Sequence, residues 1–365
     1  MKKSLLLVGA FLTVAAMAQA KEVVPAPIVV TEAPVQIVEK EVIVYRDREP
    51  VGFRPNGYVN LYLRYYGETE GQKDKKVNPA TDWHKGANNY SRTQLEGKIN
   101  MTEVQSLYFR VRDYHDWDNQ DEVSGKKGTD TKLNYYYKHG NVGDSRVDFT
   151  SELEYRFRGD SNDKQHVWYK ANFNFADYMF NNDYVKTTDF TVAPYYRYTW
   201  WSNDSNYKNE VGIYANIEHS HPWGFATQLE FDTIGYNFYA NNEFNKNAAG
   251  DYTEDKELNV TINAIISQTT PLYSNEKVSL KWYTDGGFDS YTWSGEKQFG
   301  TLEDQAVSYE AKLVTGLKAN YAATPFVNLY GELMGEYRNW AVSNEKSATN
   351  WRWQPYVTLG VKTTF

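Results

Sequence analysis

The chain has 365 residues with a formal net charge of -8 and no cysteine, which argues against nucleic-acid binding, a basic membrane-surface patch, a disulfide framework and a cysteine-based zinc site. Aromatic residues make up 16% of the chain, with 31 Tyr, 17 Phe and 11 Trp. Aromatic side chains fit the half-buried surface of a pleated sheet, so this composition favours β structure.

Residues 1–20 have the three parts of a secretory signal peptide. Lys2 and Lys3 form a basic start, an apolar stretch follows, and Ala18-Gln19-Ala20 is a small-x-small cleavage site. The apolar stretch is shorter than the roughly 20 residues that a membrane-spanning helix needs. We therefore expect export of the protein, with cleavage after Ala20.

Residues 21–56 differ in composition from the rest of the chain. Prolines such as Pro25, Pro34 and Pro50 alternate with valine and glutamate, a mixture typical of an extended, poorly packed segment. We interpret this segment as a flexible periplasmic lead-in. The alternative is that it docks into a lumen or onto the cell wall.

From residue 57 to the end, the chain repeats one pattern in which apolar and polar residues alternate. In the run at residues 146–158, Phe149 and Leu153 fall on one side and Glu152 falls on the other. Such alternation predicts a β-strand with one apolar and one polar face. No stretch approaches the 18 or so consecutive apolar residues of a transmembrane helix, so the pattern favours strands throughout.

About fourteen such runs follow one another, and each is longer than the strands of about 5 to 6 residues usual in soluble proteins. They match the roughly 9 to 11 residues with which a tilted strand crosses a bilayer. The predicted fold is all-β: an antiparallel transmembrane β-barrel of about 14 strands over residues 57–365. The runs span residues 58–66, 94–101, 106–114, 132–138, 146–158, 167–175, 189–200, 210–219, 225–233, 257–266, 277–284, 307–320, 326–338 and 353–365.

The connections between the runs alternate in length. Residues 67–89 and 115–130 are long and polar, whereas residues 102–105 and 220–224 are short. Long outer loops that alternate with short periplasmic turns are typical of an outer-membrane barrel. The alternation is weakest at residues 176–186, which are too long for a tight turn, and a missed or merged strand there would raise the strand number to about 16.

The last ten residues, YVTLGVKTTF, place Val357, Leu359, Val361 and Phe365 on one side of a two-residue period. Backbone groups in lipid must be paired within the protein, so a membrane sheet has to close without an edge. We therefore expect the last strand to pair with the first and the ring of Phe365 to face lipid. Bacterial outer-membrane barrels end in similar strands, and this resemblance implies that the barrel-assembly machinery recognises Phe365.

Several segments resemble the fusobacterial FomA-type major outer-membrane porin. They are the mature start KEVVPAP, the segment VEKEVIVYRDRE, the strand entry RPNGYVNLYLRYYGETE and the terminal GVKTTF. The likeness covers the whole chain and is most specific over residues 21–70. It implies a voltage-sensitive, weakly selective diffusion channel that forms a homotrimer without cofactors. It also implies exposed loops that serve in adhesion to other bacteria.

The strand number predicts a narrow pore. Barrels of about 8 strands fill with side chains, whereas those of 16 to 18 leave a water-filled lumen. Basic residues on the polar faces concentrate in the earlier strands and acidic ones in the later strands, so that opposed charges would create a transverse field. The alternative is that neighbouring charges only neutralise one another on the wall. The residues expected to line the pore are Arg64, Lys98, Arg110, Arg112, Lys132, Arg146, Arg156, Arg158, Lys170, Arg197, Glu210, Glu230, Asp232, Glu257, Glu332 and Glu336.

Two other functions compete with a diffusion porin. The first is an adhesin that acts through the long outer loops of the barrel. The second is a soluble β-sandwich lectin, in which the apolar strand faces would point inward and the polar ones outward. One sequence does not show which face points inward. Catalysis is not expected, because the chain has no HExxH, GxSxG or phosphate-loop pattern. His219 and His221 share a strand side, but interfacial packing explains them better than a metal. The expected partners are outer-membrane lipid, the barrel-assembly machinery, further copies of the chain, and surface ligands or other bacteria.

Overall fold

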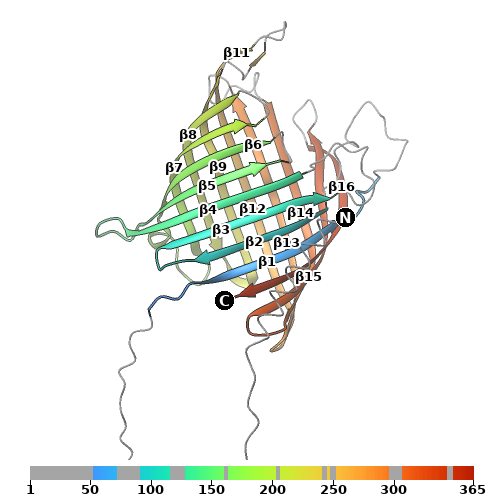
Figure 1. Ribbon diagram of the computed structural model, residues 1–365. Coiled ribbons are helices and arrows are strands. Elements are labelled where there is room, and N and C mark those ends of the chain that lie inside the picture. The colour runs from blue at the N-terminus through green and yellow to red at the C-terminus, as the bar shows by residue number, and fades with distance from the viewer. Residues whose placement is uncertain are drawn as a thin grey trace, which may run out of the picture. The chain divides into compact units, whose positions relative to one another are not determined.

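The computed structural model describes residues 52–71, 91–115, 128–159, 163–202, 206–240, 245–246, 252–295, 306–342 and 348–365. Fourteen of its strands form one closed antiparallel barrel, in which each strand pairs with the next along the chain and β1 pairs with β16 (Figure 1). Two short strands, β10 (Asn245–Lys246) and β11 (Tyr252–Glu254), form a separate hairpin between β9 and β12. Among the described residues, no helix has the length and apolar character needed to cross a membrane.

The barrel strands confirm the predicted runs, and those of the second half of the chain are longer than predicted. They are β1 (Asn56–Tyr66), β2 (Ser91–Asn100), β3 (Gln105–His115), β4 (Gly128–Asn141), β5 (Asp148–Arg158), β6 (Lys164–Asn174), β7 (Lys186–Trp201), β8 (Tyr207–Ser220), β9 (Phe225–Tyr239), β12 (Lys256–Ser274), β13 (Val278–Gly295), β14 (Ala306–Ala322), β15 (Val327–Val342) and β16 (Ala348–Thr364).

The connection between β6 and β7 contains no further barrel strand. It holds one turn of 3-10 helix, Ala176–Tyr178, and a bridge between Asn181 and Lys186. The barrel therefore has fourteen strands rather than sixteen.

The two ends of the barrel differ in their connections. We call the end where β1 begins and β16 finishes the turn end, and the opposite end the loop end. The turn end carries the short connections at residues 101–104, 142–147, 175–185, 221–224, 275–277 and 323–326. The loop end carries the long connections at residues 67–90, 116–127, 240–255 and 296–305, and also the short ones at residues 159–163, 202–206 and 343–347.

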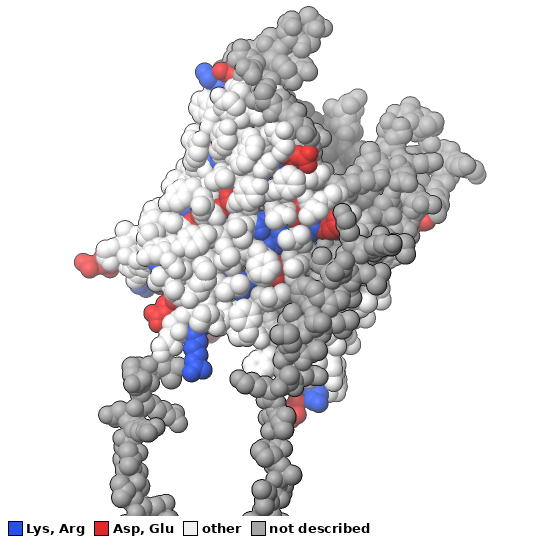
Figure 2. Space-filling model, in the orientation of Figure 1, with Lys and Arg blue, Asp and Glu red and all other residues white. Residues whose placement is uncertain are grey.

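Polarity in this barrel is the reverse of that in a soluble protein. On β5, Leu153 is 47% exposed and Tyr155 is 36% exposed. The residues that alternate with them, Glu152 and Glu154, are only 6% and 1% exposed. A closed sheet has only an outer and an inner face, so the exposed apolar residues lie outside and the buried charges lie inside. Uncharged residues accordingly cover most of the described barrel surface in Figure 2. A sandwich with an apolar interior is excluded by this arrangement.

The closing pair of strands is hydrogen-bonded along its length, from Tyr58 opposite Thr364 to Tyr66 opposite Tyr356. Beyond the last residue of β16, Phe365 continues the pairing: its backbone N–H donates to the Gly57 carbonyl at 3.1 Å and its carbonyl accepts from the Gly57 N–H at 3.0 Å. The expected pairing of the last strand with the first is confirmed. The side chain of Phe365 is 53% exposed and continues the outward series of β16.

An arginine in the middle of the outer face should destabilise the barrel in lipid. Leu153 is the central residue of β5, so Leu153→Arg should cost about 2 to 4 kcal/mol, measured by urea titration of folding into phospholipid vesicles. Val142→Arg is the matched control, because Val142 is equally exposed but lies in the turn before β5. We expect it to change stability by no more than about 0.5 kcal/mol. Equal effects of the two variants would contradict contact of Leu153 with lipid.

Candidate functional site

The candidate site is the inner wall, by which we mean the inward-facing side chains of the barrel strands. Directly paired residues on neighbouring strands share a face, so the register extends the inward assignment from strand to strand. One such row runs across seven strands and is buried at most of its positions. It consists of Asn134, Glu154, Trp168, Arg197, Glu210, Asn237 and Glu257.

A carboxylate that the sequence did not single out organises the basic part of the wall. Asp130 on β4 is 1% exposed and lies between arginines of both neighbouring strands. Arg156 donates to it from Nε at 2.9 Å and from Nη2 at 2.7 Å, and Arg110 donates from Nη2 at 2.9 Å. Arg112 instead donates to Gln94 at 2.6 Å and to the Tyr114 hydroxyl at 3.1 Å. Two guanidinium groups thus bind one carboxylate, and the third belongs to Arg112, the residue directly opposite Asp130 on β3, so this part of the wall has an excess of positive charge.

Two further carboxylates on β5 are held by residues of the adjacent strands. Glu154 pairs with Lys132 at 2.7 Å and with the ring of His166 at 3.0 Å. Glu152 pairs with Lys170 at 3.0 Å. The amide of Asn134 donates to both glutamates, at 2.6 and 2.9 Å, and so links the two pairs. These pairs are an instance of the alternative, in which charges neutralise one another on the wall, and they join adjacent strands.

Glu210 on β8 is fully buried and has three partners. Arg197 donates to it from Nε at 3.1 Å, Tyr195 donates from its hydroxyl at 2.6 Å, and the Lys208 ammonium lies 3.5 Å away. Tyr195 reaches Glu210 by lying flat on the wall over Gly235, where an added Cβ would come within 2.4 Å of the Tyr195 hydroxyl. A larger residue at this position would therefore have to displace the hydroxyl of Tyr195 from its contact with Glu210.

Acidic residues without basic partners occupy the next part of the wall. Asn216 donates to Asp189 at 2.6 Å and to Glu218 at 3.1 Å. Glu230 accepts from Tyr214 at 2.9 Å and from an asparagine amide on β12. Within the part of the chain that the structure describes, none of these three carboxylates pairs with a lysine or arginine. Together with Asp232 on β9, we call Asp189, Glu218 and Glu230 the acidic arc.

The acidic arc faces strands that carry basic residues. In the closed order of fourteen strands, β9 is seven steps from β2 in either direction, and β12 is likewise opposite β3. Glu230 and Asp232 lie near the middle of β9, and Arg110 and Arg112 lie near the middle of β3. Charges of opposite sign thus occupy roughly opposite parts of the wall at mid-strand positions.

The remaining predicted residues have separate contacts. Glu332 pairs with Arg64 at 3.1 Å and lies 3.5 Å from Lys318. Glu336 lies 3.5 Å from Arg338 on the same strand. Lys98 and Arg158 occupy inward positions of β2 and β5, and Glu257 accepts from the Tyr239 hydroxyl at 2.6 Å.

Arg146 lies apart from the arginines of β3 and β5. It precedes β5, in the turn at residues 142–147, and its guanidinium carbon is 4.7 Å from the centre of the Tyr178 ring. The expected cleavage site at Ala20 lies outside the described residues.

The polar contacts described above join side chains on the same strand, on adjacent strands, or on strands two apart, as with Arg64 on β1 and Glu332 on β15. Cations also lie over aromatic rings of the same wall, for example Lys170 at 4.3 Å and Arg197 at 4.9 Å from the ring centre of Trp168. These contacts hold long charged side chains along the wall rather than across the lumen. The arrangement can therefore present fixed charges to a solute.

No protein-family model and no curated protein matches the chain. Among solved structures, a bacterial polysaccharide outer membrane secretin is 11% identical with a TM-score of 0.39, over 85% of this chain and 98% of that chain. OmpT of Vibrio cholerae is 10% identical with a TM-score of 0.34, over 86% and 97%. An anion-selective porin from Comamonas acidovorans is 12% identical with a TM-score of 0.33, over 86% and 99%. The similarity to these outer-membrane barrels is one of fold alone.

Removal of the charge of Asp130 should destabilise the inner wall. Asp130→Asn keeps the shape of the side chain but leaves Arg110 and Arg156 without their shared carboxylate, which should cost about 1 to 3 kcal/mol in urea unfolding. Asp144→Asn removes the same charge from an exposed turn residue and should change stability by no more than about 0.5 kcal/mol. Wild-type stability of Asp130→Asn would show that the arginines do not depend on this carboxylate.

Proposed function

We propose that the chain forms a water-filled channel in the outer membrane for passive diffusion of ions and small hydrophilic solutes. The observation that carries the proposal is the reversed polarity of a closed barrel, with apolar residues outside and charged residues on the inner wall. An outer face of this kind is suited to lipid, and the closed sheet leaves no unpaired edge there. Charged groups on the inner wall need water or polar partners. Water in the lumen would solvate the charged groups that the cross-strand pairs do not fully satisfy.

We also propose that the protein is a homotrimeric porin of the fusobacterial FomA type. This assignment rests on the sequence motifs, of which RPNGYVNLYLRYYGETE supplies β1. Its export after Ala20 and a role of its loops in adhesion remain predictions, since residues 1–51, 72–90 and 116–127 lie outside the described ranges.

We propose further that the wall charges set the ion selectivity of the channel. The excess positive charge around Asp130 favours anions, and the acidic arc on the facing strands favours cations, so the net preference is weak. The field between the two regions would orient dipolar solutes as they pass. Most carboxylates on β4 and β5 are paired with basic residues, whereas Arg112 donates to the uncharged side chains of Gln94 and Tyr114. Arg112 is therefore the clearest single contributor on the basic side.

Conductance in a planar bilayer tests both the channel and its selectivity. The purified protein should produce discrete ion-conducting steps, and Arg112→Gln should shift the reversal potential in a salt gradient toward cation selectivity. Exposed charges are screened over about 10 Å at 0.1 M salt, so the shift should be clear in dilute salt and small in concentrated salt.

Arg146→Gln is the matched control for this measurement. It removes the same charge from the turn end, outside the strands, and should leave the reversal potential close to that of the wild type. Absence of conducting steps would refute the channel. An unchanged reversal potential of Arg112→Gln in dilute salt would refute its position on the ion path.

Phe365 should matter more for assembly in the cell than for the stability of the finished barrel. Its deletion removes an exposed ring and two backbone hydrogen bonds at the end of the closing pair, a loss of a few kcal/mol at most. We expect little folded protein in the outer membrane but nearly normal refolding into detergent. Phe180→Ala removes another exposed aromatic at the turn end and should assemble normally. Wild-type membrane levels after deletion of Phe365 would contradict an assembly signal.

A further inference from the structure

The turn between β8 and β9 contains an aromatic residue in a conformation that aromatic residues disfavour. Trp223 has a φ of 58° and a ψ of 26°, and Gly224 follows with a φ of 74°. Two successive left-handed residues form the hairpin turn that asparagine and glycine favour, because a Cβ atom crowds the backbone there. Trp223 is also 86% exposed, so its ring gains little from packing within the chain. A strained and exposed tryptophan points to a contact outside the chain.

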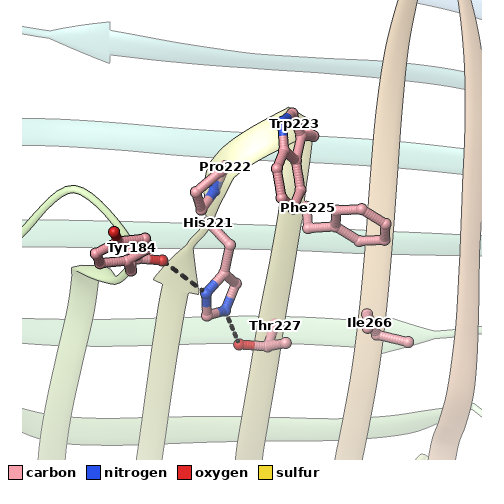
Figure 3. Close-up of a pocket in the computed structure, with 7 residues that line it drawn as sticks. All are labelled: Tyr184, His221, Pro222, Trp223, Phe225, Thr227 and Ile266. Atoms are coloured by element: carbon pink, nitrogen blue, oxygen red, sulfur yellow. Dashed lines mark hydrogen bonds between the residues drawn. The ribbon is translucent and has the colours of Figure 1, made fainter.

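Trp223 borders a hollow of about 540 Å³ on the outer surface at the turn end (Figure 3). Its apolar lining comes from the β6–β7 connection, the β8–β9 turn, and the outward faces of β9 and β12. Phe225 is 39% exposed and Ile266 is 53% exposed, and both belong to the outward series of their strands. The volume lies within the roughly 300 to 1,000 Å³ of sites that hold small organic ligands.

His221 fixes the shape of this hollow. Its Nδ1 lies 3.3 Å from the backbone carbonyl of Tyr184, and its Nε2 lies 3.0 Å from the hydroxyl of Thr227 (Figure 3). A neutral ring can donate from Nδ1 to the carbonyl and accept at Nε2 from the hydroxyl. One side chain thus ties the β6–β7 connection to the turn and to β9. The hollow is therefore built by the chain before any ligand enters.

We propose that this hollow holds one acyl chain of a phospholipid from the leaflet at the turn end, with the indole of Trp223 at the level of the headgroups. The proposal rests on the membrane placement under the proposed function. An apolar hollow on a lipid-facing surface has no water to fill it, and an acyl chain has the matching chemistry. Tryptophan and tyrosine favour the headgroup level because their rings are apolar with one polar group, and Tyr184 at the rim is 77% exposed.

The variant Trp223→Asn separates lipid binding from folding, because asparagine suits the left-handed position better than tryptophan does. We expect its resistance to urea to equal or exceed that of the wild type. The protein would be folded into vesicles of phosphatidylethanolamine and phosphatidylglycerol, extracted in mild detergent, and examined by native mass spectrometry. Wild type should retain a phospholipid, and Trp223→Asn should bind it roughly tenfold more weakly.

Phe326→Asn is the matched control, since Phe326 is a 62% exposed aromatic at the turn end outside the hollow. It should retain lipid as the wild type does. If Trp223→Asn does not fold, Trp223→Gly, which also suits the turn, provides the same comparison.

Three results obtained with the variants would overturn the lipid site. The first is that Trp223→Asn retains as much lipid as the wild type, and the second is that Phe326→Asn loses as much lipid as Trp223→Asn. The third is that Trp223→Asn loses oligomers but not lipid, which would assign this face to a second copy of the chain. A wild-type protein that conducts ions but carries no phospholipid would overturn the lipid site and leave the channel intact. A protein that binds lipid but never conducts ions would overturn the channel and leave the lipid site intact.

Discussion

Under the proposed membrane placement, the structure depends on the requirement that every backbone N–H and C=O of a sheet in lipid find a partner within the protein. The pairing of β1 with β16, continued by Gly57 and Phe365, meets this requirement by removing both edges of the sheet. Closure also creates an inside and an outside, which an open sheet does not have. Successive residues of each strand then face the inside and the outside in turn. The charged side chains lie on the inside and form the inner wall.

The ion pairs of the inner wall contribute more to the register of the strands than to overall stability. Burial of charges costs solvation energy that their mutual attraction only offsets, so replacement of such pairs by apolar residues is often neutral. Asp130 meets Arg110 and Arg156 only in the observed register. A slip of one residue would turn Asp130 toward the outer face and leave the arginines unpaired. The charged wall thus penalises misaligned neighbours strongly.

The sequence predicted the strands and their two faces well, because a two-residue period is a local property. Leu153 and Glu154 lie on the faces that alternation assigned to them. It predicted the partners of the charges poorly. Neutralisation between neighbouring charges was the alternative to a transverse field, but no pattern in the sequence indicated that Glu154 pairs with Lys132 and His166 on the adjacent strands. Lys132 and His166 both lie directly opposite Arg156 and diagonally across from Glu154. Long side chains reach such diagonal neighbours, but the register that brings them together is not visible in one sequence.

Two contributors to the wall were missed for a different reason. Asp130 lies two residues before the predicted start of its strand at residue 132, and His166 lies one residue before the run at residues 167–175. Asp130 was placed in the connection at residues 115–130, although it shares its parity with Lys132. His166 was placed at the beginning of a strand but was not assigned to the wall. The ends of strands are where local patterns are weakest, since the polar residues of a loop and of an inner face have the same composition. A prediction that extended both strands by two residues, with the same alternation, would have included Asp130 and His166.

The strand order also bears on how the barrel folds. Spatial order repeats chain order, so each hairpin can form from neighbouring segments and enlarge the sheet by one strand at a time. The junction of β1 with β16 differs, because the segments that meet there are separated by the whole barrel, and their encounter has the largest loop-closure entropy. Hairpins that have already formed shorten that search, since they bring the two chain ends to the same rim. The kinetic barrier to a finished barrel should therefore lie at this single junction, after most of the sheet is in place.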